Sequence, residues 1–165
     1  AADLARSKDP DPDILAYESG AFVLAARWAM ANKQSPAAAF AAAERALARA
    51  EQLDASTGFV IGARFDLERW KAEALVDAGR DPASALARAR TAVTKASETD
   101  HGSPAIHFWL GQLAAVEARS LAQATSRDAI ARRTAAEQTA RTELAAAVAG
   151  NRFYQPHADE LLAGL

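Results

Sequence analysis

The chain has 165 residues, with 19 basic and 21 acidic side chains and no cysteine, a length that suits one compact domain. The absence of cysteine excludes disulfide scaffolds, thiolate metal sites and cysteine nucleophiles, and it leaves the redox compartment open. A formal net charge of −2 gives no overall attraction to nucleic acid, which binds a concentrated excess of Lys and Arg. No apolar run approaches the roughly 20 residues that span a bilayer, so we expect no membrane insertion and a cytoplasmic location.

The composition predicts an all-α chain. Alanine accounts for 46 of the 165 residues, and it is the strongest helix former, whereas the β-branched and aromatic residues that favour strands are sparse. From the apolar spacing and the capping signals we expect helices at about residues 12–32, 36–53, 58–78, 82–98, 104–123, 127–149 and 156–163.

The six prolines mark helix starts, because proline lacks an N–H and its φ suits the first helical position. Most of them follow a residue whose side-chain oxygen can cap a backbone N–H. We expect such caps in the pairs Asp9–Pro10, Asp11–Pro12, Ser35–Pro36, Asp81–Pro82 and Ser103–Pro104, with a weaker version at Gln155–Pro156.

Apolar residues along the first segment follow two helical lines. The first line contains Ile14, Tyr17, Ala21, Leu24 and Trp28, and the second contains Leu15, Phe22, Ala26 and Ala29. Two lines predict that this helix contacts neighbours on two sides, and the segment 58–78 shows the same feature. Helices that are packed on both sides are typical of stacked hairpins.

The chain contains an internal repeat with a period of 46 residues. Ala26–Asp54 aligns with Ala72–Asp100 without a gap, and 9 of the 29 positions are identical. Seven of the nine are alanine pairs, which an alanine-rich chain partly supplies by chance. The apolar register and the capped prolines also match, however, and these matches favour a true repeat.

Each copy predicts a helix, a tight turn and a returning helix, which together form an αα-hairpin. Such hairpins carry too little large apolar surface to fold alone, so they must stack and share a core. A third copy begins at Ser103, and its longer, more polar second helix suits a terminal repeat. We therefore expect a single helical-repeat domain over residues 1–165, an all-α stack of antiparallel hairpins at about 12–53, 58–98 and 104–149 with a C-terminal cap at 151–165.

The segment Asp77–Ala89, with the sequence DAGRDPASALARA, resembles the turn and second helix of tetratricopeptide-like (TPR-like) repeats. It is similar to the alanine- and arginine-rich repeats found C-terminal to the kinase domain of bacterial serine/threonine protein kinases, whose ends are similar to Asn151–Leu165. Of the four signature positions of a TPR first helix, Leu110 and Gly111 match, and the period of 46 falls in the range of HEAT-type repeats. The resemblance implies a TPR-like α-solenoid that serves as a binding scaffold attached to a kinase or working beside one.

The first helices of the hairpins carry the residues that we expect to bind a partner. Aromatic rings make good contact anchors, and cations on the same helices can pair with acidic groups, although core packing is the alternative for the tryptophans. The candidate partner-binding residues are Tyr17, Arg27, Arg64, Trp70 and Lys71. They predict a protein–protein interaction scaffold that holds a segment of a protein or peptide in a groove formed by the first helices.

The sequence contains no phosphate-binding loop, nucleophile elbow, zinc-protease motif or kinase catalytic loop, so we expect no enzymatic activity and no cofactor. An alternative from another class is a closed helical bundle with a small-molecule or metal site that uses His107, or Glu98 with His101. A further alternative is a structural spacer or dimerisation element within a larger chain. The arginines from Arg119 to Arg141 alternate with acids, which favours a salt-bridged surface over a nucleic-acid groove.

Overall fold

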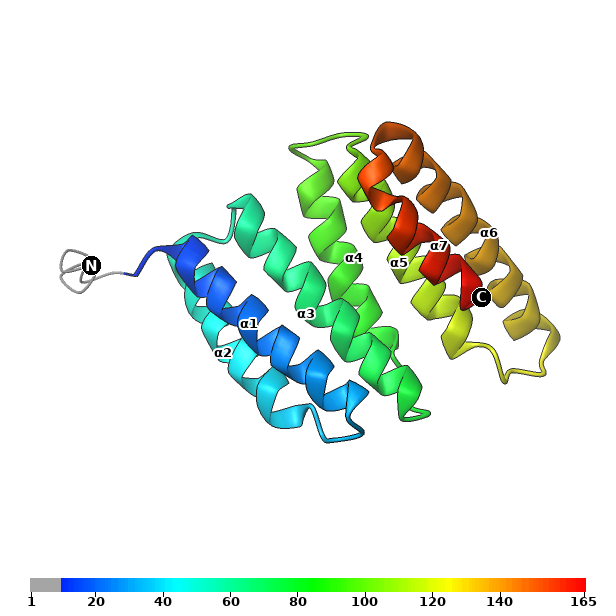
Figure 1. Ribbon diagram of the computed structural model, residues 1–165, viewed down its shortest axis with the longest axis horizontal. Coiled ribbons are helices and arrows are strands. Elements are labelled where there is room, and N and C mark those ends of the chain that lie inside the picture. The colour runs from blue at the N-terminus through cyan, green and yellow to red at the C-terminus, as the bar shows by residue number, and fades with distance from the viewer. Residues whose placement is uncertain (1–9) are drawn as a thin grey trace. The chain divides into compact units, whose positions relative to one another are not determined.

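The computed structural model describes residues 10–165, which form seven α-helices and one short 3-10 helix (Figure 1). These residues contain no strand, and α1·α2, α3·α4 and α5·α6 pack as neighbouring helices, which confirms the predicted all-α fold of helical hairpins. Each predicted helix is present, with ends within three residues of the prediction. The elements are α1 (Pro12–Ala31), α2 (Ala37–Asp54), α3 (Gly58–Asp77), α4 (Ala83–Ser97), α5 (Pro104–Ser120), α6 (Arg127–Gly150), η2 (Arg152–Tyr154) and α7 (Gln155–Ala163).

The chain divides into two compact units, residues 1–67 and 68–165, and the boundary lies within α3. Unit 1 holds the α1·α2 hairpin and the first half of α3. Unit 2 holds the second half of α3 together with α4, α5, α6, η2 and α7. A single domain over residues 1–165 stays a prediction.

Two of the predicted proline-associated caps form as expected. Asp11 and Ser103 are N-caps with proline directly after them, and their side-chain oxygens accept hydrogen bonds from the N–H groups of Asp13 (2.8 Å) and Ala105 (3.2 Å). Each oxygen satisfies one of the N–H groups that a helix start leaves without an internal partner. The cap predicted for Asp9 lies outside the described residues.

The turns of the first two hairpins repeat one another at the spacing of 46 residues. Lys33 and Gly79 both adopt the left-handed conformation, with φ of 57° and 65°. Their N–H groups donate to carbonyls three residues earlier at 3.0 and 2.9 Å, and the next N–H groups donate to carbonyls five residues earlier, both at 2.8 Å. This pair of bonds is the Schellman pattern that ends a helix. The sequence repeat therefore has a structural counterpart at its turns.

The proline that follows each of these turns lies one residue earlier in its helix than predicted. Pro36 and Pro82 are themselves the N-caps, with helical φ of −81° and −87°, and neither helix has a side-chain cap at that position. Ser35 and Asp81 stand one residue before the N-cap, and their oxygens accept from the N–H groups of Ala37 (3.4 Å) and Ala83 (2.9 Å).

In unit 1, α1 packs against α2 through faces built largely of alanine. The buried residues are Leu15, Ala16, Ser19, Val23, Ala26 and Ala29 on α1 and Phe40, Ala43, Ala46, Leu47 and Ala50 on α2. The other predicted line of α1, from Ile14 to Trp28, is exposed. The prediction that α1 contacts neighbours on two sides is therefore wrong for this line, because α2 covers the opposite face of the helix.

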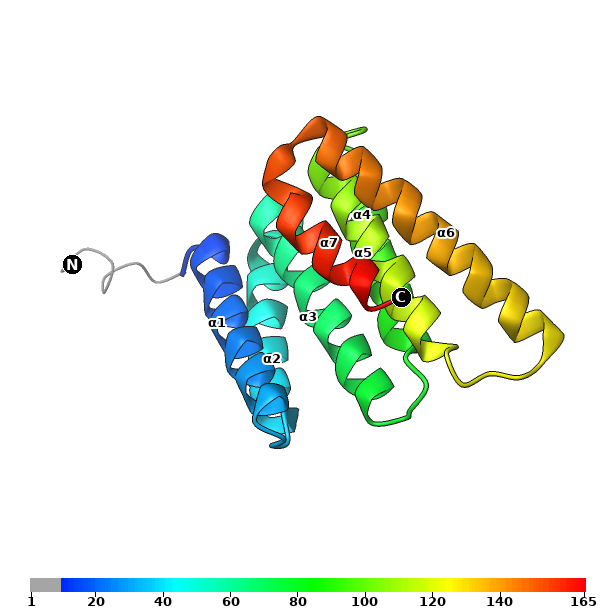
Figure 2. The ribbon, with the colours of Figure 1, turned by 45° about the vertical axis from the view of Figure 1, so that its right-hand side comes forward.

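In unit 2, α5 and α6 approach closely because Gly111 has no side chain. A Cβ at Gly111 would lie 2.6 Å from Cγ of the fully buried Leu144. The short helix α7 returns along this pair (Figure 2). Leu161 of α7 and Leu165, which follows the end of the helix, pack against a cluster of buried alanines that includes Ala140. The predicted C-terminal cap is thus a helix that covers a face of the third hairpin, preceded by η2, which the sequence did not predict.

Candidate interaction groove

The two unit 1 residues predicted on α1 lie on its exposed surface. The Tyr17 ring is 62% exposed and tilts against the Phe59 ring at a centroid distance of 5.1 Å. Arg27 is exposed on the same helix. Both residues are therefore accessible for contact with a partner.

Arg64 is held by acids of its own unit. Its guanidinium donates to Glu51 through Nε (2.9 Å) and Nη2 (2.7 Å), and to Glu44 through Nη1 (2.7 Å). Burial alone lowers the pKa of Arg64, but the hydrogen bonds and negative charges of Glu51 and Glu44 outweigh burial and raise the pKa above its ordinary value. These three charge-assisted hydrogen bonds, two of them to one carboxylate, hold α3 against α2.

In unit 2, the predicted residue Lys71 lies beside a buried acid, and the predicted residue Trp70 contacts an arginine. The carboxylate of Glu68 is 1% exposed, and it pairs with Lys71 (3.6 Å) and with Arg88 of α4 (2.8 Å). Trp70 is partly buried, and the guanidinium carbon of Arg69 lies 4.1 Å from its ring centroid. Pairing satisfies a charge that is costly to bury alone. Lys71 therefore has a structural role within α3, and Arg88 joins α4 to α3 through the same carboxylate.

A groove in unit 2 gathers arginines from several elements. It has a volume of about 590 Å³, and its lining comes from the end of α3, the turn into α4, α4, the end of α5, the connection after it and α6. Its apolar wall includes Val76, Leu86 and Leu121. We call it the arginine groove, because four guanidinium groups border it, those of Arg80, Arg90, Arg119 and Arg132.

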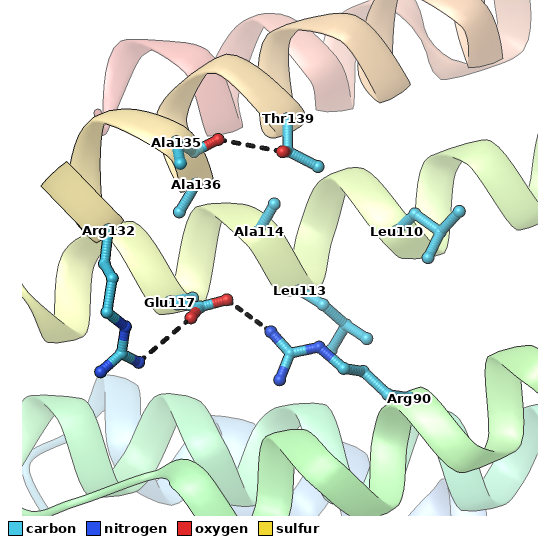
Figure 3. A pocket seen from close by; sticks show the side chains of 9 residues that line it. All are labelled: Arg90, Leu110, Leu113, Ala114, Glu117, Arg132, Ala135, Ala136 and Thr139. Carbon is cyan, nitrogen blue, oxygen red and sulfur yellow. Dashed lines mark hydrogen bonds and ion pairs between the residues drawn. The ribbon is translucent and has the colours of Figure 1, made fainter.

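An ion triad crosses the edge of the arginine groove. Glu117 of α5 pairs with Arg90 of α4 through one carboxylate oxygen and with Arg132 of α6 through the other, at 3.4 Å for the second pair (Figure 3). The two guanidiniums are about half and two-thirds exposed, whereas Glu117 is mostly buried. Glu117 therefore fixes two cationic groups at the surface while their donors remain accessible to solvent.

The triad also borders a smaller pocket of about 290 Å³ between α4, α5 and α6. Figure 3 shows Leu110, Leu113 and Ala114 along α5 and Ala136 and Thr139 along α6, with the triad at one side. Arg90, Glu117 and Arg132 thus line both this pocket and the arginine groove.

Arg119 joins the groove from the end of α5 and pairs with Glu73 of α3, whose side chain is buried. Burial lowers the pKa of the Arg119 guanidinium below its ordinary value. Arginine titrates far above neutral pH, so Arg119 stays cationic. Four guanidiniums thus border the groove, and the acids beside them are Asp81, Glu117 and Glu73.

Sequence reasoning missed the arginine groove. Arg90 and Glu117 are 27 residues apart, and Glu117 and Arg132 are 15 apart, so no local spacing connects them. The interleaved charges of this region did indicate a salt-bridged surface, and the triad is part of one.

The histidine that the alternative bundle would use is paired with an acid. His107 Nδ1 lies 2.6 Å from Glu143 Oε2, between α5 and α6. Glu98 and His101 are exposed. Within residues 10–165 no group of three or more His, Cys, Asp or Glu side chains is placed to hold a metal ion.

Comparison with known proteins identifies no relative of the chain. No protein-family model, curated protein or solved structure matches the chain. Among the helices of residues 10–165, none combines the length and apolar character needed to cross a membrane.

Proposed function

We propose that the chain is a non-catalytic protein–protein interaction scaffold whose arginine groove binds an acidic segment of a partner protein. The observation that carries the proposal is the convergence of Arg80, Arg90, Arg119 and Arg132 on one groove. Guanidinium groups bind carboxylates through paired N–H donors, and this geometry gives specificity as well as energy.

The groove favours a peptide segment over a single anion because apolar side chains line it beside the arginines. Val76, Leu86 and Leu121 offer contacts to apolar side chains that alternate with acidic ones. Exposed ion pairs contribute little individually, and their strength falls with added salt. We therefore expect moderate affinity that weakens as ionic strength rises.

The proposed class of function is the one predicted from the sequence, but the proposed binding groove lies elsewhere. In unit 2 the groove uses α5, the first helix of its hairpin, but Trp70 and Lys71 do not line it. The setting beside a bacterial serine/threonine kinase, in the cytoplasm, is part of the proposal, and its support is the resemblance of residues 77–89 to kinase-attached repeats.

The test is a selection of short peptides from a random displayed library on the full chain, followed by titration of a labelled selected peptide. We expect the selected peptides to combine Asp or Glu with apolar residues. The double variant Arg90→Ala/Arg132→Ala loses two donors and leaves Glu117 to repel the acid, so it should weaken binding about tenfold or more.

The matched control is Arg133→Ala. Arg133 follows Arg132 on α6, but it pairs with Glu137 on its own helix at 2.7 Å and does not line the groove. This control should bind as the unchanged chain does. Selection of neutral or basic peptides, or equal affinity in the double variant, would contradict the proposal, provided that circular dichroism shows an intact fold.

A further inference from the structure

Helix α1 exposes a straight line of large apolar side chains in unit 1. Ile14 is 48% exposed, Tyr17 62%, Leu24 60% and Trp28 62%, and the exposed Ala21 lies at the middle of the line. We call these five residues the α1 seam. Most surface apolar residues occur singly, and a contiguous exposed patch marks an interaction site.

The spacing of the α1 seam identifies the shape that covers it. The five positions are separated by three, four, three and four residues, which is the alternation of the a and d positions in a coiled coil. A seam of this kind is narrow, and a single helix packed along it fills it. The exposed Glu18 and Arg27 flank the seam, which limits its width.

A second α1 fits this seam in the antiparallel direction. When the two-fold axis lies between Ala21 and Leu24, the small Ala21 of each copy faces Leu24 of the other. Tyr17 of each copy then faces the Trp28 ring of the other, and such aromatic pairs add to the gain from burial. The pattern complements itself, as an isologous interface requires.

The helix dipoles also favour the antiparallel direction. In an antiparallel pair the N-terminal end of each α1 lies beside the C-terminal end of the other, so the opposite partial charges of the helix ends are neighbours. A parallel pair would place like ends together, which is unfavourable.

The exposed area is sufficient for a dimer. Phe59, 53% exposed, extends the seam through its contact with Tyr17. At about 75–125 Å² for each large side chain that is half exposed, the five large residues present about 500 Å² per copy. A dimer would then bury about 1,000 Å² in total, the area that a biological interface needs to reach.

We propose that the α1 seam is the interface of a homodimer, in which α1 packs antiparallel against α1 of a second copy. The interface uses unit 1 and is independent of the arginine groove. It therefore goes beyond the proposed function, and either one can fail without the other.

Sedimentation of the full chain tests the dimer over chain concentrations from about 1 to 200 μM. The expected result is a mass that rises from 17.4 kDa toward twice that value. Leu24→Asp places a charge in the seam and should raise the dissociation constant at least about tenfold. The matched control Ile130→Asp changes an aliphatic residue that is 50% exposed on α6, and it should leave the dimer intact.

Disulfide trapping then tests the direction of pairing, because the chain has no cysteine of its own. Tyr17→Cys and Trp28→Cys variants, mixed in reduced form and then oxidised, should yield mainly the mixed disulfide. Homodisulfides of each variant would overturn the antiparallel arrangement. A monomer at every concentration, or a dimer that Leu24→Asp leaves unchanged, would overturn the proposal.

Discussion

The first and third hairpins differ in what covers their outer surface. In the third hairpin, α7 lies over α5 and α6, and Leu161 and Leu165 cover the alanine-rich cluster around Ala140. In the first hairpin, α2 buries one face of α1, and the line from Ile14 to Trp28 stays exposed. A hairpin of alanine-rich helices is thus completed either by a helix of its own chain or, as we propose for the first, by a second copy.

The largest expected effect on stability is at Gly111 in the middle of α5. Gly111→Ala places a Cβ 2.6 Å from Leu144 Cγ and 3.2 Å from its backbone nitrogen, so α5 and α6 must separate. Overpacking of this kind should lower the free energy of unfolding by about 2–3 kcal/mol. The matched control is Gly20→Ala, because a Cβ at Gly20 would have no atom within 4 Å among those compared. This variant should raise the free energy of unfolding by about 0.5–1 kcal/mol through its higher helix propensity. Urea denaturation measures both, and equal effects would contradict the close approach of α5 and α6.

A smaller effect is expected at the helix that covers the third hairpin. Leu161→Ala removes part of the contact between α7 and the alanine cluster of α5 and α6. Because Leu161 is partly buried, the loss should be about 1–2 kcal/mol of unfolding free energy, below the range for fully buried leucines. The exposed Glu160 on the same helix supplies the control, and Glu160→Ala should change stability by less than about 0.5 kcal/mol. Thermal unfolding in which both variants match the unchanged chain would show that α7 does not cover the hairpin.

The α1·α2 interface contains a buried hydroxyl group that weakens it. Ser19 is fully buried, and its Oγ has no hydrogen-bond partner among the described residues. Ser19→Ala removes this unsatisfied group without creating a large cavity, so it should raise the free energy of unfolding by about 1 kcal/mol. The contrasting variant is Ser56→Ala: this exposed hydroxyl donates to Asp54 Oδ1 at 2.6 Å, so its removal should not raise the free energy of unfolding. A destabilised Ser19→Ala would mean that the hydroxyl is satisfied.

The smallest expected gain in stability is at the repeated turn. Lys33 holds a left-handed φ of 57°, which a side chain disfavours and glycine accepts. Lys33→Gly should raise the free energy of unfolding by about 0.5 kcal/mol. Gly79→Ala at the equivalent position should lower it by about 1 kcal/mol. Denaturant midpoints measure both changes, and changes of opposite sign would support one shared conformation of the two turns. A lower free energy of unfolding in both variants would contradict it.

The helices and their turns could be predicted from the sequence because the signals are local. Proline, capping side chains and apolar periodicity each act within about one helical turn, so the predicted helices are all present. The spacing of 46 residues between Lys33 and Gly79 extended this local information to a second hairpin, and the two turns share their hydrogen bonds.

The candidate site could not be predicted because it depends on long-range packing. The triad of Arg90, Glu117 and Arg132 forms only when α4, α5 and α6 have packed, and each residue alone resembles any solvated charge. The exposure of Trp28 was missed for the same reason: periodicity shows that a helix has an apolar line, and packing decides whether that line is covered.

Oxidative footprinting of the side chains at two chain concentrations tests the central contrast most directly. We expect Trp28 and Tyr17 to be labelled strongly in dilute solution and to become protected as the chain is concentrated, while Leu161 and Leu165 stay protected throughout. Strong labelling of Trp28 at both concentrations, or labelling of Leu161 to the same extent as Trp28, would contradict it.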